Sequence, residues 1–142
     1  MSMTNWDEVT WRVSDATYAA WNAHDPDAVA SWFTADARVR DSTSEVWEIG
    51  PGPVRERAAM MCGALPDLTL TRQVLIIEGP RHADRWVMEG THTGELLGMA
   101  GTGARVRIEG ATFTTLDEEG MVIEDVHHID YSTLFNQLGA AD

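Results

Sequence analysis

The hydrophobic periodicity of the chain changes at Pro66, and this change limits the fold more than any other feature. Before Pro66, apolar residues recur at spacings of three and four, as on one face of a helix. After Pro66 they alternate with polar residues, as in strands buried on one side. Helices followed by strands are typical of an α+β domain. The sequence predicts a single domain over residues 1–142, with three N-terminal helices packed on a curved antiparallel β-sheet.

The starts of the helices are marked by capping residues. Asn5, followed three positions later by Glu8, has the form of a helix start and predicts a first helix from about Trp6 to Asn22. Asp25 and Pro26 predict the start of a second, short helix. A third helix is expected after the break at 50–53, with apolar residues at 54, 58 and 61 and an end at 63. Short extended segments are expected at 37–41 and 46–49.

Four strands are expected beyond Pro66, each with two distinct faces. On the first, Leu68, Leu70, Val74 and Ile76 are expected to share a face that Arg72 interrupts. The fourth carries Val122, Glu124, Val126, His128 and Asp130 on one side and Ile123, Asp125, His127, Ile129 and Tyr131 on the other. Several glycines in the central hairpin allow the sheet to bend. A curved sheet under helices can enclose a cavity with a mouth.

Charge and cysteine content narrow the classes of function. The net charge of −13 and the pI near 4.6 disfavour binding to nucleic acid or to anionic membrane surfaces. One cysteine, Cys62, cannot form an intramolecular disulfide, which fits a reducing cytoplasm. The N-terminus has no secretory signal pattern, and no apolar run is long enough to span a membrane. We expect a cytoplasmic protein that acts on a small molecule.

Six tryptophans are available to line a pocket for a flat apolar or aromatic ligand, although tryptophans more often fill the core. Met88 is expected on the same strand face as Trp86, and Tyr18 lies on the first helix. The residues predicted to contact such a substrate are Tyr18, Trp32, Trp47, Trp86 and Met88.

Asp130 and His128 are the first candidates for acid/base chemistry. They are two positions apart on a strand, so both side chains are expected on one face and could enter one cavity. A carboxyl group among apolar neighbours has a raised pKa and can exchange a proton near neutral pH. The alternative is a solvated strand end that pairs with surface charges.

Asp41 and His92 are further candidates. Asp41 ends an extended segment and could face the cavity, or it could cap a turn with Ser42 and Thr43. His92 is expected on the same strand face as Trp86. It could donate a hydrogen bond to a ligand, or it could be buried in the core with a hydrogen bond to a threonine hydroxyl.

Metal, cofactor and covalent chemistry have no motif in this sequence. His127 and His128 are adjacent and would face opposite sides of a strand, so they cannot hold one ion together. No phosphate-binding loop, dinucleotide fingerprint or nucleophile elbow is present. We expect no metal and no cofactor.

Four segments resemble the SnoaL-like polyketide cyclases of the nuclear transport factor 2-like superfamily. Three of them are 18–25 (Tyr-Ala-Ala-Trp-Asn-Ala-His-Asp), 33–41 (Phe-Thr-Ala-Asp-Ala-Arg-Val-Arg-Asp) and 65–68 (Leu-Pro-Asp-Leu). The fourth is a pair, in which 90–98, with 102–103 shortly after it, goes together with 130–139. The resemblance implies a cone-shaped α+β fold with a pocket between helices and sheet. It also implies that Asp130 is the acid/base of an intramolecular aldol closure, or that Asp41 is the base, as in the similar isomerases. Similar proteins are frequently homodimers through the outer face of the sheet.

The chain departs from this family at its last strand. Similar cyclases often read Glu-His-Trp where this chain has Glu124-Asp125-Val126, and their frequent basic residue before the final turn is replaced by Thr115 or Leu116. His127 or His128 could substitute for the lost polar group, or the substrate could differ.

The resemblance and the candidate residues together indicate a cofactor-independent cyclase that acts on a carbonyl-rich, polyketide-like intermediate. Asp130 would remove the proton, and His92 or His128 would donate to the carbonyl oxygen. The alternatives are isomerisation, dehydration or epoxide opening in the same pocket, and a domain that binds a small ligand without catalysis.

Overall fold

The computed structural model describes residues 4–139. Helix α1 spans Trp6–Asn22, and the side chain of Asn5 accepts a hydrogen bond of 3.2 Å from the backbone N–H of Glu8. Helix α2 spans Pro26–Ala30 and is capped by Asp25 in the same way. Both helix starts predicted from the sequence are therefore confirmed.

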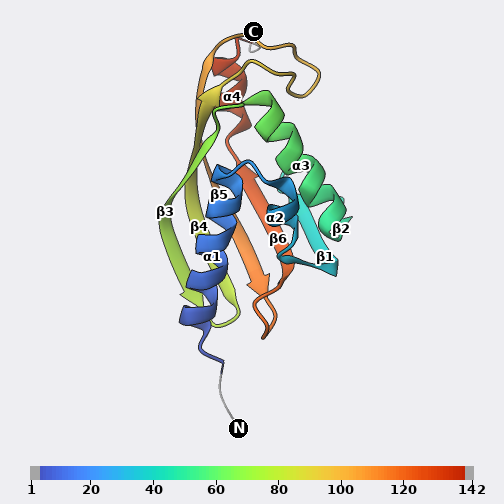
Figure 1. The fold of residues 1–142 in the computed structure, drawn as a ribbon, viewed down its shortest axis with the longest axis vertical. Coiled ribbons are helices and arrows are strands. Elements are labelled where there is room, and N and C mark those ends of the chain that lie inside the picture. Colours follow the sequence, from blue (N-terminus) through green and yellow to red (C-terminus); the bar gives the residue numbers. More distant parts are fainter. Residues whose placement is uncertain (1–3, 140–142) are drawn as a thin grey trace.

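The remaining elements form one sheet and two more helices. They are β1 (Phe33–Asp41), β2 (Glu48–Ile49), α3 (Pro51–Ala64), β3 (Thr69–Glu78), β4 (Arg81–Thr91), β5 (Arg105–Leu116), β6 (Val122–Ile129) and α4 (Tyr131–Gln137). The strand order is β2-β1-β6-β5-β4-β3, and α1, α2 and α3 cover one face of the sheet (Figure 1). The α+β architecture predicted from the change of period is confirmed.

Two details of that prediction are corrected. The sheet is mixed rather than antiparallel, because β1 pairs with β6 in parallel. Alternation of residue types indicates a strand but not the direction of its distant partner. A fourth helix, α4, is the last element of the described residues, and it begins at Tyr131, to which the sequence suggested that the last strand continues. Asp130 stops the strand because its side chain caps α4.

Strand β3 contains a β-bulge, beyond which the side chains that point inward are those at the other set of alternate positions. The register of β3 against β4 shifts between Arg72 and Val74. Leu70 and Arg72 therefore share a face with Leu75 and not with Val74, and Ile76 is 63% exposed. The expectation that Val74 and Ile76 lie on one face with Leu70 is wrong, because a bulge adds one residue and flips the alternation.

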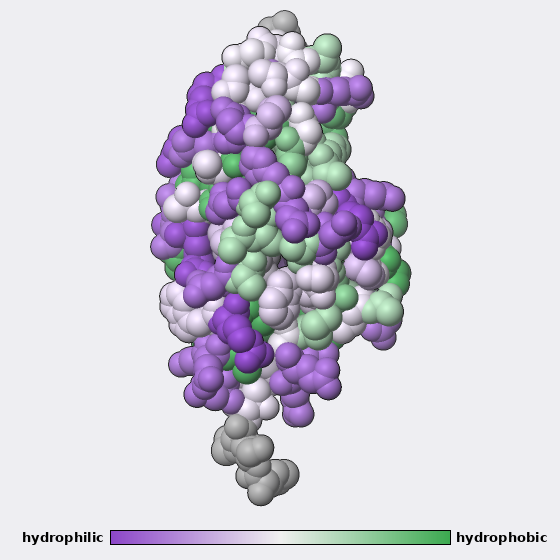
Figure 2. Space-filling model, viewed as in Figure 1, coloured by the Kyte–Doolittle hydropathy of each residue, from purple (hydrophilic) through white to green (hydrophobic). Residues whose placement is uncertain are grey.

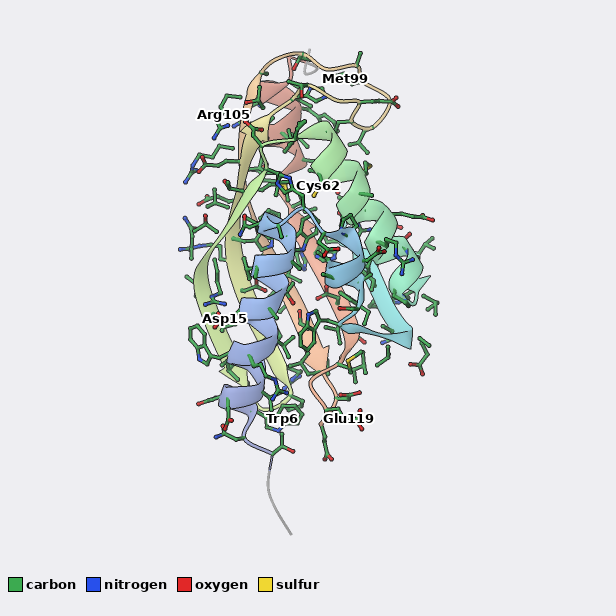
Figure 3. The ribbon with its side chains drawn as sticks, viewed as in Figure 1. Trp6, Asp15, Cys62, Met99, Arg105 and Glu119 are labelled. Atoms are coloured by element: carbon green, nitrogen blue, oxygen red, sulfur yellow. The ribbon has the colours of Figure 1, made fainter. Side chains whose placement is uncertain are left out.

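The buried residues form two clusters between the helices and the sheet. One gathers α1, α2, the start of α3 and β1, and the other gathers the end of α3, β4, β5 and α4. Polar residues cover much of the helix-bearing surface, with apolar residues gathered along its middle (Figure 2). The long connection that carries Met99 lies at the opposite end of the molecule from the β5–β6 turn at Glu119 (Figure 3). Within residues 4–139, no helix is long and apolar enough to cross a membrane.

Candidate active site

A cavity of about 160 Å³ lies between the helices and the inner face of the sheet. Most of its wall is apolar, and the apolar side chains come from α1, α2, α3, β1, β3, β4, β5, β6, α4 and the 92–104 connection. They include Trp21, Met61, Leu70, Trp86, Met88, Leu96, Ile108, Ile129 and Leu134. The pocket expected from the glycine-rich, curved sheet is therefore present.

Six inward polar residues form two rows across β4, β5 and β6. In one row, Asp84 pairs with Thr112, and Thr112 with His127. In the other, His82 pairs with Thr114, and Thr114 with Asp125. All six line the cavity. We call these six residues the polar floor of the cavity; most of the remaining wall is apolar.

Asp125 is the most deeply buried carboxyl group of this floor, with 5% of its surface exposed. The Thr114 hydroxyl donates to its Oδ1 atom over 2.6 Å. Burial raises the pKa of Asp125 to about 7, although the Thr114 hydrogen bond and the charge of Arg57 act in the opposite direction. A carboxyl group with this pKa can both accept and return a proton at neutral pH.

His127 lies beside Asp125, with 3.6 Å between its Nε2 atom and Oδ2 of the carboxyl group. The Trp86 indole N–H donates to the Thr112 hydroxyl over 3.0 Å, and that hydroxyl lies 3.3 Å from Nδ1 of His127. With Trp86 as its donor, Thr112 can give its own hydrogen to Nδ1, which assigns the imidazole hydrogen to Nε2. Burial, and then the charge of Arg57, lower the pKa of His127 to about 4, so the ring is neutral at pH 7.

The indole of Trp86 rests directly on Gly110. A Cβ atom at position 110 would lie 2.2 Å from Cζ2 of Trp86, which is closer than real atoms approach. Gly110 is therefore needed for the indole to lie flat against β5 and reach Thr112. Gly110 is one of the hairpin glycines that were expected to let the sheet bend, and it also makes room for the Trp86 side chain.

Asp84 forms a second acidic centre with Tyr18. The Tyr18 hydroxyl donates to Oδ2 of Asp84. Burial raises the pKa of Asp84 to about 6 against the effect of that hydrogen bond, and the charge of Asp125 adds to the rise. Burial and the charge of Asp84 raise the pKa of Tyr18 well above its usual value. Arg72 packs over the Tyr18 ring, with 5.4 Å to the ring centroid, and thus holds this pair in position.

Asp41 lies at the edge of the cavity, behind Tyr131. The Tyr131 hydroxyl donates to Asp41, and Tyr131 itself lines the cavity. Burial opposes ionisation of Asp41, but hydrogen bonds from Tyr131 and Thr43 hold its pKa below the usual value. Both interpretations of Asp41 thus have support, since it caps the turn through Thr43 and also contacts a cavity residue.

Asp130 and His128 do not share the cavity, so that expectation is corrected. The inward residues of β6 are Asp125 and His127, and His128 is exposed on the outer face, where its ring meets Phe113 edge-on at 5.5 Å. Asp130 is exposed and caps α4 by accepting hydrogen bonds from the backbone and the hydroxyl of Thr133, which lower its pKa. The physical reason is the two-residue period of the strand, which sends neighbours to opposite sides.

His92 and two of the tryptophans also lie outside the cavity lining. His92 is fully buried, and its Nδ1 atom is bound by the backbone and hydroxyl of Thr102, as in the core alternative. Trp32 packs in the first core cluster, and Trp47 stacks with Arg38 on the other side of β1. Of the residues predicted to contact substrate, Tyr18, Trp86 and Met88 line the cavity.

Sequence reasoning missed most of the polar floor. Its signal is a set of polar residues at alternate positions, namely His82 and Asp84, Thr112 and Thr114, and Asp125 and His127. Three such pairs on three neighbouring strands predict an inward polar patch once the strand order is known. Among residues 4–139, no group of three or more His, Cys, Asp or Glu side chains is arranged to hold a metal ion.

Comparison with known proteins gives a family match over most of the chain. The profile of the SnoaL-like polyketide cyclases matches residues 12–138. AclR of Streptomyces galilaeus, provisionally assigned as a hydroxylase, shares 25% identity and a TM-score of 0.85 over 96% of this chain and 84% of its own. A provisionally assigned SnoaL-like polyketide cyclase from Jannaschia sp. CCS1 has 17% identity, a TM-score of 0.85, and coverage of 100% and 99%.

A third similar structure is IdmH of Streptomyces antibioticus, a provisionally assigned polyketide cyclase. It has 24% identity and a TM-score of 0.71 over 91% of this chain and 97% of its own. A ketosteroid isomerase-like fold from Catenulispora acidiphila also superimposes, with a TM-score of 0.75. A search of the curated proteins finds no significant match. The cone-shaped fold implied by the resemblance is therefore confirmed.

Proposed function

Because the chain belongs to the SnoaL-like polyketide cyclase family, we propose that it closes a ring by an aldol-type reaction in a carbonyl-rich, polyketide-like substrate. Asp125 is the general acid/base of this reaction, and no cofactor takes part. One observation carries the proposal: Asp125 is a buried carboxyl group with a raised pKa that faces an apolar cavity. Asp125 thus takes the role that the sequence suggested for Asp130.

The reaction needs one proton to leave and one to return. Asp125 removes a proton from a carbon next to a carbonyl group, and the resulting enolate carbon attacks a second carbonyl carbon in the same molecule. One carbon–carbon bond forms, the attacked carbonyl becomes an alkoxide, and Asp125 returns its proton to that oxygen. The raised pKa of Asp125 brings both transfers close to balance at neutral pH.

His127 supplies a neutral donor next to the base. Its Nε2 atom is too far from Asp125, at 3.6 Å, for a normal hydrogen bond, so the N–H is free to donate to a ligand oxygen that lies beside the pair on the cavity side. A carbonyl oxygen there accepts from His127 while its neighbouring carbon faces Asp125. Donors aimed at the developing oxyanion typically contribute about 3 kcal/mol in a site that excludes water.

The apolar wall contributes by holding the substrate folded. Trp86 and Met88 form one side of the cavity, and Tyr18 belongs to the helix side. Flat aromatic surfaces stack well on an indole ring. A substrate held with its two reacting carbons in contact loses little further entropy on ring closure.

The proposal is tested with two probes and the variant Asp125→Asn. The first probe is 2-tetralone, whose uptake of deuterium next to the carbonyl is followed by NMR. We expect Asp125→Asn to lower the enzyme-catalysed exchange at least about 100-fold, because an amide cannot accept the proton. The matched control is Glu124→Gln, one residue away on the outer face and paired with Arg38, which should keep the wild-type rate.

The second probe is 2-(3-oxobutyl)-1-tetralone, a 1,5-diketone that can form a further ring by intramolecular aldol closure. Exchange of 2-tetralone together with ring closure of the diketone supports the cyclase. Exchange without ring closure would favour the isomerase alternative. If wild-type protein binds both probes but catalyses neither reaction, the proposal fails in favour of a ligand-binding domain.

A further inference from the structure

We propose that Arg57 makes the cavity selective for ligands that carry an acidic oxygen, such as a carboxylate or an enolised 1,3-dicarbonyl group, and holds that oxygen at the Asp125 end. This inference deepens the proposed function, because it names a substrate class for the same site. It rests on the position of Arg57, on its hydrogen bonds and on the charges around it.

Arg57 reaches the cavity from the middle of α3. It lines the cavity, and its Nη2 atom donates to Oε1 of Glu48 over 2.9 Å. Its Nη1 atom is buried and has no hydrogen-bond acceptor among residues 4–139. One side of the guanidinium group is thus satisfied by β2, and the other side is not.

A guanidinium group cannot avoid the cost of an unpaired buried N–H by losing its charge. Arginine stays protonated at any pH at which proteins fold, so its N–H groups need acceptors. A buried donor without a partner costs about 1–3 kcal/mol, and more when it is charged. An oxygen of the ligand placed at Nη1 removes this cost, and an anionic oxygen gains from the charge as well.

The charge distribution makes this position unusual in the protein. The chain has a net charge of −13, and its basic residues are ten arginines with no lysine. Arg57 is the one arginine among the described residues that line the cavity. Arg57 lies close enough to Asp41 and Asp125 for its charge to lower the pKa of both carboxyl groups. Without Arg57, an acidic ligand would meet only negative or neutral groups here.

The position also matches the proposed chemistry. Removal of a proton from a carbon between two carbonyl groups spreads negative charge onto their oxygen atoms. An oxygen at Arg57 and a carbon at Asp125 place this charge next to the guanidinium group as it develops. A substrate that is already acidic at oxygen is held by the same contact before the reaction begins.

The inference is tested by binding, with 2-naphthoate as the anionic probe and 2-naphthamide as its neutral counterpart of similar shape. Calorimetry on the wild-type chain should give a Kd for naphthoate at least about tenfold lower than for naphthamide. Arg57→Gln should remove this preference. The matched control is Arg55→Gln, on the same helix, which removes an exposed arginine paired with Asp27 and should keep the preference.

A second variant keeps the inference testable if the Arg57 variant does not fold. Glu48→Gln removes the negative partner and leaves Arg57 in place, so naphthoate should bind as tightly as to wild type or more tightly. Equal affinities of wild type for the two probes, an unchanged preference in Arg57→Gln, or a lost preference in Glu48→Gln would overturn the inference. These results do not depend on proton transfer. Asp125→Asn should retain naphthoate binding, so failure of the catalytic proposal is seen separately.

Discussion

The two faces of β6 carry nearly the same chemistry in different surroundings. The inner face has Asp125 and His127, and the outer face has Glu124 and His128. Asp125 is buried under the helices, and its pKa is raised to about 7. Glu124 pairs with Arg38 at the surface, and His128 is exposed beside Phe113. The difference lies in the surroundings and not in the side chains: burial in the apolar cavity gives the inner carboxyl group the raised pKa on which the proposed acid/base role depends.

If the inner face of β6 carries the base, the largest effect should be seen in the pH dependence of 2-tetralone exchange. Asp125 must be ionised to accept a proton, so the rate should rise about tenfold per pH unit below its pKa and level off above about 7. His82 and His127 have pKa values lowered to about 4 by burial, so they stay neutral over this range. The rate is measured from pH 5 to 8.5.

Asp84 also titrates in this range, because burial raises its pKa to about 6. Asp84→Asn is therefore the control for the pH profile. The increase of the rate with pH, which is the rising limb of the profile, should persist in this variant. It should move to slightly lower pH, since the negative charge of Asp84 next to Asp125 is gone. If the rate of Asp84→Asn no longer rises with pH, the base is Asp84 on β4 and not Asp125 on the inner face of β6.

The next effect is expected from one of the two histidines of β6. His127→Leu should slow exchange about 100-fold, because the neutral N–H donor beside Asp125 is lost. The same change should move the rising limb to higher pH, since a donor near the ionised carboxylate stabilises it. His128→Leu removes the same side chain from the outer face and should leave both the rate and the limb unchanged. Thermal melting of both variants checks that the fold is intact.

If His127→Leu and His128→Leu slow the exchange equally, the slower rate results from a less stable strand and not from loss of the His127 donor in the cavity. A slower rate with an unmoved limb would leave His127 as a packing residue only. The shift of the limb is therefore the informative readout, because loss of packing alone does not change the proton affinity of Asp125.

The parts of the fold that depend on local signals could be predicted. The caps at Asn5 and Asp25 and the change of period at Pro66 depend on neighbouring residues only, and the structure confirms them. The bulge in β3 and the parallel pairing of β1 with β6 depend on distant strands. No local pattern specifies them, because the same alternation suits several pairings.

The site was hard to predict for a related reason. Both faces of β6 offer an acid and a histidine, and alternation separates the two sets without saying which one meets the helices. The strand pairing of Thr112 with His127 and of Thr114 with Asp125, together with the helices packed over the sheet, determines which face of β6 lies in the cavity. The segment Glu124-Asp125-Val126, where the chain departs from the family pattern, includes the cavity residue Asp125, and His127 is the member of the histidine pair that lies in the cavity.

The smallest effect is expected at Asp130, the residue that the sequence placed first. Its carboxyl group is exposed and accepts two hydrogen bonds from Thr133 at the start of α4. Asp130→Asn keeps a good capping residue and should change neither the melting temperature nor the exchange rate. Asp130→Ala removes the cap and should lower the melting temperature slightly, with the exchange rate retained because α4 contributes Leu134 to the cavity wall and not an acid. If Asp130→Asn loses the exchange activity but melts normally, Asp130 is the base, and the assignment of that role to Asp125 on the inner face of β6 is wrong.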